Sequence, residues 1–164
     1  MKEFRKIVKQ VELLDIRLGR CEAHLVAPDG EPPAELQQMV NVGAAKNAET
    51  NELNYVISIR LVGGAAKLAT DMPAMLIEAA FGLKYSVQSL DGITEELVMR
   101  FGQVNGVFNI WPYWREFVQN MTCRLGLPGL RIPLLKKPFE FTQNQLPSNG
   151  ALKQDSQKKK RIKR

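Results

Sequence analysis

Apolar side chains recur at every second position along two stretches in the middle of the chain. The regularly spaced apolar members of the first stretch are Leu53, Tyr55, Ile57, Ile59 and Leu61. The second stretch is longer, and its members are Met75, Ile77, Ala79, Phe81, Leu83, Tyr85 and Val87. Because successive side chains of a strand point to opposite faces of a sheet, this period of two predicts two β-strands, each with one buried face.

The opposite face of the second stretch is also partly apolar, with Leu76, Ala80 and Gly82 among its side chains. A long strand with a semi-apolar outer face exceeds what one small core needs. Two interpretations stay open: the strand bends and crosses two environments, or its outer face meets a subunit or a ligand.

Two further strands are predicted nearer the N-terminus. In residues 10–27 the apolar parity changes at Gly19-Arg20, which is the signature of a β-bulge. The members before the change are Leu14, Ile16 and Leu18, and those after it are Cys21, Ala23 and Leu25. Residues 35–47 form a weaker strand, whose apolar face is Leu36, Val40 and Val42 if Gln38 is passed over. Residues 1–9 are either a short helix or the entry to a strand.

Helical patterns follow the strands. Thr94 precedes Glu95 and Glu96, as an N-cap precedes the acidic first turn of a helix. Residues 102–106, with a glycine at each end, are expected to end this short helix. A second, longer helix is expected to have Pro112 in its first turn and to stop at Gly126.

The longer helix carries two adjacent apolar rows. The first row is Tyr113, Phe117, Met121 and Leu125, and the second is Ile110, Trp114 and Val118. At ~100° per residue the rows span an arc of about 140°, which is wide for a single contact. We expect Tyr113, Phe117 and Met121 to pack on the chain's own sheet, and part of the second row to meet another subunit.

These elements predict an α+β fold, in which a four-stranded antiparallel sheet carries helices on one face. The 164 residues are enough for one domain with a real core. We assign residues 1–146 to this domain and residues 147–164, which are polar and then basic, to a disordered tail. No apolar run reaches the ~18 residues of a membrane span, and the N-terminus lacks a signal-peptide pattern, so the expected location is the cytoplasm.

The net charge of +6 lies in the tail. Residues 153–164 hold seven Lys or Arg against one Asp, whereas residues 1–152 hold 16 basic and 16 acidic side chains. A basic body would favour nucleic acid as a partner, and a neutral body with a basic tail favours it much less. Three interpretations of the tail stay open: it is solvated and disordered, it binds nucleic-acid phosphates through Lys158–Arg164, or it steers acidic clients or a membrane surface.

The chain lacks the parts of a familiar active site. It contains no GxSxG, P-loop, GxGxxG or HExxH motif, and its single histidine, His24, has no metal-site spacing to Cys21 or Cys123. We therefore expect no enzymatic activity, no metal and no cofactor, and we expect both cysteines to be buried thiols. Instead, the chain is rich in bulky apolar side chains, which taken singly fit a core and taken together suit a surface that repacks around varied partners. They are Met39, Met75, Leu76, Phe81, Trp111, Trp114, Phe139 and Phe141.

One stretch carries a resemblance to a known family. Residues 112–116, Pro-Tyr-Trp-Arg-Glu, open an apolar helix that leads to Arg124 and then to Leu-Pro-Gly-Leu-Arg-Ile-Pro at residues 127–133. This order, placed after four strands, resembles the SecB family of protein-export chaperones. The Arg-Leu-x-Leu-Pro motif and the preceding Thr-Glu-Glu-Leu sequence resemble the SecB-like chaperones of toxin–antitoxin systems more closely than SecB itself. The resemblance covers about residues 10–138.

The resemblance implies a Greek-key-like sheet with a crossover between strands 1 and 2 at Pro28–Pro33, and a homotetramer built as a dimer of dimers. It implies ATP-independent holding of unfolded polypeptides, either preproteins or an antitoxin, in surface grooves, for export or for handover to a partner. The implied client groove consists of Leu36, Met75, Leu76, Phe81, Leu83, Phe139 and Phe141. The implied oligomer interface consists of Ile110, Trp114, Val118 and Met121.

Two features depart from SecB itself. SecB is acidic and contacts the translocase motor ATPase through its sheet face, whereas this body is neutral, which argues against that partner. SecB also ends in a long helix, whereas Pro138 and Pro147 bracket only eight residues here. Beside the general holdase, a chaperone dedicated to one antitoxin and a nucleic-acid-binding protein stay open. A small-molecule carrier ranks last, because a closed carrier needs more than four strands.

Overall fold

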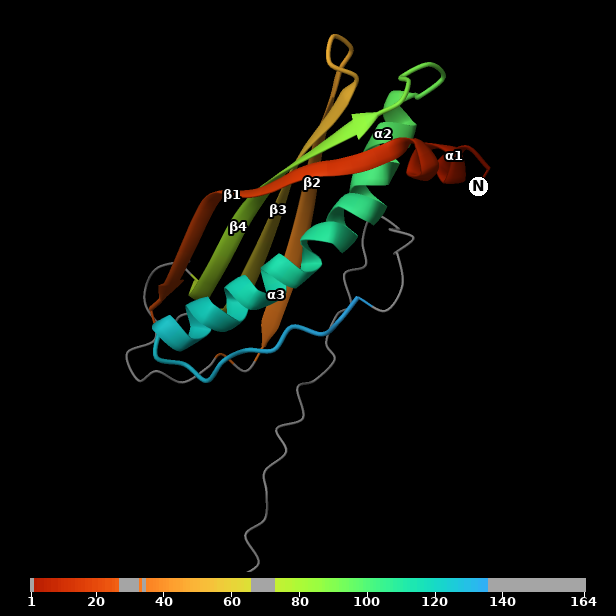
Figure 1. Cartoon of the computed structure of the whole chain (residues 1–164). Helices are drawn as coiled ribbons and strands as arrows, with labels where there is room; N and C mark the ends of the chain where they lie inside the picture. The colour runs from red at the N-terminus through yellow and green to blue at the C-terminus, as the bar shows by residue number, and fades with distance from the viewer. Residues whose placement is uncertain (1, 27–32, 34, 66–72, 136–164) are drawn as a thin grey trace, which may run out of the picture.

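The computed structural model describes residues 2–26, 33, 35–65 and 73–135 (Figure 1). Phe139, Phe141 and the tail at 147–164 lie outside the described residues, as does most of the crossover at 27–33. The elements, in chain order, are α1 (Lys2–Gln10), β1 (Val11–Leu25), β2 (Leu36–Asn47), β3 (Glu52–Ala65), β4 (Pro73–Val87), α2 (Glu95–Phe101), the π-helical turn η1 (Gly102–Gly106) and α3 (Val107–Arg124). The first nine residues, which the sequence left open, are therefore helical from Lys2 onward.

All four strands pair antiparallel in one sheet, in the order β1-β4-β3-β2. The helices lie on one face of this sheet (Figure 1), so the predicted α+β fold is confirmed. The Greek-key detail stays a prediction. The order leaves β1 and β2 as the two edges of the sheet within the described residues.

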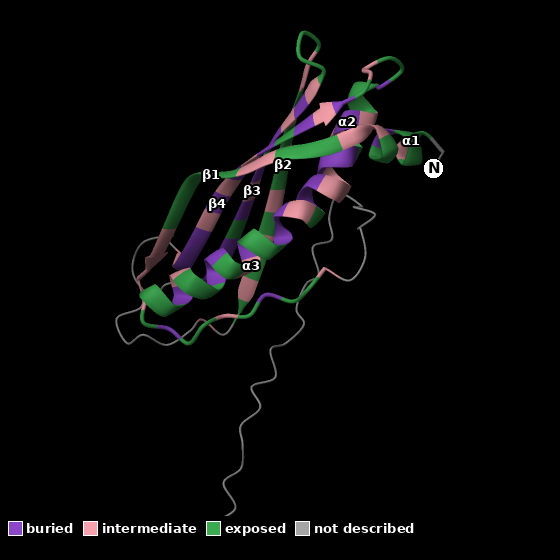
Figure 2. Ribbon diagram, viewed as in Figure 1, coloured by how far each residue is buried: buried purple, intermediate pink, exposed green. Residues whose placement is uncertain are grey.

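The two central strands form the floor of the core. Their helix-facing side chains are buried, and they are the alternating residues 53–61 of β3 and 75–87 of β4 that the sequence pattern picked out. Figure 2 shows this buried stripe running beneath the helices. Tyr55 and Tyr85 meet edge to face with centroids 5.7 Å apart, and Phe101 of α2 packs on both. This aromatic cluster fixes α2 to the sheet.

β1 is bent by two irregularities. Its pairing with β4 shifts between Leu18 and Arg20, which confirms the predicted bulge, and it shifts again between Leu13 and Asp15. The second shift was not predicted, because Leu13 and Leu14 are both apolar and fit either parity. A bulge leaves one extra residue unpaired, and Leu14, in the second shift, is half exposed.

One expectation about the helices is wrong. The stretch from Gly102 to Gly106 does not end α2 but continues it as a π-helical turn into α3. The two glycines let this turn approach the sheet closely: a Cβ on Gly102 would lie 2.5 Å from a ring carbon of Tyr55, and one on Gly106 would lie 2.8 Å from Ile57 Cδ1. Glycine therefore serves here for close packing and not as a stop.

Pro112 also lies inside α3 and not in its first turn. A proline removes one hydrogen bond of the helix. The side chains of Ile110 and Trp111, directly before it, are buried, and this burial offsets the loss. The predicted start of α2 and the predicted end of α3 are confirmed. The Thr94 hydroxyl accepts a hydrogen bond from the Leu97 N–H at 3.2 Å, and Gly126 takes a left-handed φ of 78° just after α3.

Candidate functional site

The apolar rows of α3 match their expected roles only in part: Phe117 is buried and Met121 is half-buried against the core, as expected. Ile110, Trp114 and Val118 are all 0% exposed in the chain's own core, so they have no surface left for another subunit. Tyr113, which was expected to pack on the sheet, is 50% exposed. The helix is rotated so that Trp114 faces β2, where its indole N–H donates to Gln38 Oε1 at 2.8 Å. Gln38, the polar exception in the β2 row, thus serves as the partner of a buried tryptophan.

The expected client-groove residues do not share one surface among the described residues. Met75, Phe81 and Leu83 point toward the helices and are buried, and Leu76 lies on the opposite face of β4, where it is only 5% exposed. Leu36 is half-buried on β2. The strand parity that predicted this core also separates Met75 from Leu76, so the groove assignment stays a prediction.

An exposed apolar strip follows the free edge of the sheet at β1. Leu13, Leu14 and Leu18 are all exposed there, and Leu13 and Leu18 pair with core residues of β4 and so belong to the helix side. Figure 2 shows exposed stretches along β1. The sequence placed Leu18 on a buried face, but α3 crosses the inner strands and leaves this edge uncovered.

One flank of α3 continues toward this strip. Asn109 donates a hydrogen bond from Nδ2 to the Tyr85 hydroxyl at 2.9 Å, and Tyr85 lies opposite Leu13 in the sheet. Tyr113 is one helical turn beyond Asn109 and so shares its flank. Burial raises the pKa of Tyr85 to about 12, so its hydroxyl is protonated at neutral pH. The edge of β1 and this flank of α3 together form an apolar surface that contains one polar group, the Asn109–Tyr85 pair.

The helix-free face of the sheet has a different character. Its charges lie in pairs of opposite sign: Lys84 Nζ is 3.1 Å from Glu52 Oε2, and Arg60 Nε is 3.6 Å from Glu78 Oε2. The hydrogen bond from Lys84 lowers the pKa of Glu52. The negative charges of these pairs are therefore balanced by positive ones, in line with the zero net charge of residues 1–152 in the sequence.

A segment that we call the strap, residues 127–135, runs along the other flank of α3. The Trp111 indole N–H donates to the Pro133 carbonyl at 2.8 Å, and Arg115 Nε donates to the Ile132 carbonyl at 2.7 Å. The Thr122 hydroxyl accepts from the Leu130 N–H at 3.0 Å. Sequence reasoning treated Trp111 as excess apolar surface and gave Arg115 no role. Their spacing of four, with a donor on each, was the available signal.

The cysteines are not buried as expected. Both thiols are free and exposed, because Cys21 lies on the uncovered edge strand and Cys123 on the outward side of α3. His24 lies on β1 with Nδ1 3.6 Å from Glu22 Oε1. In the described part of the chain no three His, Cys, Asp or Glu side chains come together as a metal site would require.

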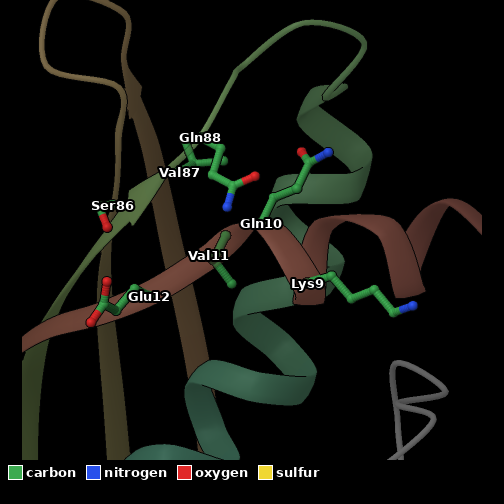
Figure 3. Close-up of a pocket in the computed structure, with 7 residues that line it drawn as sticks. All are labelled: Lys9, Gln10, Val11, Glu12, Ser86, Val87 and Gln88. Carbon is green, nitrogen blue, oxygen red and sulfur yellow. The ribbon is translucent and has the colours of Figure 1, made fainter.

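A hollow of about 330 Å³ lies where α1 joins β1, beside the end of β4. Figure 3 shows its lining, which is mostly polar, and it consists of Lys9, Gln10, Val11, Glu12, Ser86, Val87 and Gln88. It is shallow, and its side chains include no nucleophile paired with a base. Among the described helices, none is long and apolar enough to cross a membrane.

The geometry thus defines an α+β protein with an apolar edge strand and a strap on its long helix. No protein-family model matches the chain. Two relatives from two strains of Mycobacterium tuberculosis, the SecB-like chaperones Rv1957 and MT2006, are each 40% identical over 49 residues. That match covers 30% of this chain and 27% of each relative, so the chain matches only about a quarter of the length of these relatives.

A solved structure extends the likeness to nearly the whole fold. It is the Mycobacterium tuberculosis Rv1957 SecB-like chaperone in complex with a ChAD peptide from the Rv1956 HigA1 antitoxin. Its TM-score is 0.64 at 22% identity, and the match covers 85% of this chain and 100% of that chain. At this identity the likeness shows the fold. The chain therefore has the fold of a SecB-like chaperone, and the resemblance to SecB-like proteins is confirmed.

Proposed function

We propose that this protein is an ATP-independent chaperone that binds non-native polypeptide, and that its dedicated client is an antitoxin. The observation that carries the proposal is the likeness to the SecB-like chaperone that was solved with an antitoxin peptide. The relatives that match in sequence bear the same chaperone name. General export duty is the alternative, and the two charge pairs on the helix-free sheet face argue against the translocase motor ATPase as a partner.

The physical requirements of such a holdase are modest. An unfolded chain is held by apolar contacts and by free main-chain groups at a sheet edge. The other edge strand, β2, supports this proposal, since its Met39 is exposed beside an outer edge of the sheet within the described residues. Burying ~500 Å² of apolar surface at ~25 cal/mol/Å² would yield about 12 kcal/mol before ordering costs remove much of it. No cofactor or enzymatic step is required.

The assembly that we propose is a homotetramer made of two dimers. The exposed β1 edge, together with Tyr113 and Phe108 on α3, would provide a self-complementary contact between two copies. Met121, which is half-buried, is the one member of the expected interface set with surface left to contribute. A stable monomer of 18.5 kDa in solution would count against this assembly.

The test uses the full-length protein and two clients that aggregate without help: a reduced, unfolded model protein and an antitoxin encoded beside the gene of this chain. We expect suppression of aggregation without ATP at about one tetramer per client, with the antitoxin protected at a lower chaperone concentration. Equal protection of both clients would favour general duty. No protection of either client would refute the chaperone function.

A second candidate function rests on the basic C-terminus, where residues 153–164 hold seven Lys or Arg. Such a tail would bind nucleic acid through counterion release, with affinity that falls steeply with salt. Deleting residues 153–164 should abolish any such binding and leave client protection unchanged. Loss of client protection on deletion would show that the tail belongs to the chaperone site.

A further inference from the structure

Two side-chain donors on α3 recognise the main chain of an extended segment. Trp111 and Arg115 lie one helical turn apart and so project from the same flank of the helix. They donate to the carbonyl oxygens of Pro133 and Ile132, at 2.8 Å and 2.7 Å. Main-chain carbonyls are present at every residue of any polypeptide. These two hydrogen bonds therefore recognise an extended backbone and do not depend on a particular side-chain sequence.

The strap that now fills this place is held unequally along its length. Its first half is anchored by the buried side chain of Leu127 and by the hydrogen bond from the Leu130 N–H to Thr122. In its second half, residues 131–135, no backbone-to-backbone hydrogen bond to another described residue is made. Only Ile132 is buried there, at 8% exposed, while Leu134 is 65% exposed.

The second half of the strap is thus an extended, apolar, proline-containing piece of chain bound through two carbonyls, the buried side chain of Ile132 and the half-buried side chain of Leu135. An unfolded client offers the same groups. We infer that the flank of α3 at Trp111 and Arg115 is a binding site for an extended apolar stretch of non-native polypeptide, and that residues 131–135 occupy this site until a client displaces them. The inference rests on the proposed chaperone function and adds a site to it.

A client can replace the strap at little cost, because Trp111 and Arg115 would donate to two carbonyls of the client in place of those of the strap. The strap is tethered next to its site, so its effective concentration is on the order of millimolar. A weakly apolar peptide therefore fails to compete, and a client with larger aliphatic or aromatic side chains succeeds. The strap also keeps apolar area covered when no client is present, which limits self-association.

The first test weakens the strap without touching the donors. Ile132→Ala removes the buried side chain of the second half, and Leu134→Ala is the matched control on the exposed side of the same segment. The probe is fluorescein-labelled, reduced and carboxymethylated α-lactalbumin, which stays unfolded, and its affinity for the full-length protein is measured by anisotropy. Because a docked strap reduces the fraction of competent sites, Ile132→Ala should raise the affinity about fivefold or more, and the control should stay within about twofold.

The second test changes the site itself in both backgrounds. Trp111→Phe removes the indole donor, which the strap and the client would share. The loss should therefore be larger, about 2- to 10-fold, in the Ile132→Ala background than in the wild type, where the strap is weakened as well. A strap with a purely structural role predicts equal losses in both backgrounds.

A spectroscopic readout reports the strap directly. The Trp111 indole N–H resonance should shift in Ile132→Ala without client, and it should shift in the wild type when the probe is added. The Trp114 resonance, held by Gln38, should stay in place. An unchanged or lower affinity of Ile132→Ala overturns the inference while wild-type binding leaves the proposed function intact. Absence of binding by every variant, both of this probe and of the antitoxin, overturns the proposed function together with this site.

Discussion

Replacing Gly102 by alanine tests how closely the long helix approaches the sheet. The added Cβ would lie 2.5 Å and 2.6 Å from two ring carbons of Tyr55 and 3.0 Å from Val42 Cγ1. The ring cannot retreat easily, because the Tyr55 hydroxyl donates to the Val98 carbonyl at 3.0 Å and the ring packs on Tyr85 and Phe101. Overpacking of this kind costs about 1–3 kcal/mol.

Alanine also favours a helix over glycine by about 1 kcal/mol, so the two effects oppose each other. With a rigid ring as the obstacle we take the upper part of the cost, and the net loss for Gly102→Ala is about 1–2 kcal/mol. Gly106→Ala is the matched control, since it has the same helix gain and its closest contact, at 2.8 Å, is the terminal methyl of Ile57. Its net effect should be close to zero.

The assay is equilibrium urea unfolding followed by circular dichroism, at one fixed protein concentration because an oligomer's stability depends on concentration. Gly102→Ala should unfold at lower urea and melt about 3–6 °C below the wild type. Gly106→Ala should stay near the wild type. A Gly102→Ala protein as stable as Gly106→Ala would refute the account of the glycine contact.

Three other predictions concern the strap anchor, the tyrosines and the β1 edge. Thr122→Val should lose about 1 kcal/mol of unfolding free energy because the part-buried Leu130 N–H loses its acceptor, whereas Thr122→Ser should keep most of it; equal urea midpoints would contradict this. Burial raises the pKa of Tyr85 to about 12 and also raises the pKa of Tyr55. The stability that the two protonated hydroxyls contribute is therefore fully present below about pH 10, near the tyrosine pKa of the unfolded chain, and should fall as the pH rises toward 12. A midpoint of urea unfolding that is flat from about pH 9 to 11.5 would speak against it. Leu18→Asp should reduce the mass measured by light scattering to that of a smaller species, while Val56→Asp on the other face should not, and an unchanged mass for Leu18→Asp would remove β1 from the interface.

Much of the sheet was readable from the sequence because strand parity is a local property. The alternation in β3 and β4 marked the buried side chains correctly, and the parity change at Gly19-Arg20 marked a bulge. The second bulge was hidden because two adjacent leucines satisfy either parity. Which face of an edge strand is covered is not a local property, and so Cys21 was expected to be buried although it lies exposed on the edge strand β1.

The helices show a similar limit. Gly102 and Gly106 look like helix stops when only propensity is considered, and their small size is instead used by Tyr55 and Ile57 on strands far away in the sequence. The choice between two adjacent apolar rows of α3 depends on a rotation of only a few tens of degrees. No sequence pattern fixes that rotation, whereas the hydrogen bond between Trp114 and Gln38 does.

The candidate site was the least predictable part. The resemblance put Met75 and Leu76 in one groove, although strand geometry places them on opposite faces of the sheet. The exposed leucines of β1 and the strap contacts of Trp111 and Arg115 depend on tertiary arrangement. The resemblance in residues 112–133 pointed to the right fold, although it did not report these contacts.

The most direct test of the central claim is the dissociation constant of the full-length protein for an antitoxin encoded beside its gene, measured against that for unfolded carboxymethylated α-lactalbumin at the same ionic strength. A dedicated chaperone should bind the antitoxin at least about tenfold more tightly, which corresponds to about 1.4 kcal/mol. Equal affinities would assign the protein to general duty. Failure to bind either polypeptide would contradict the account.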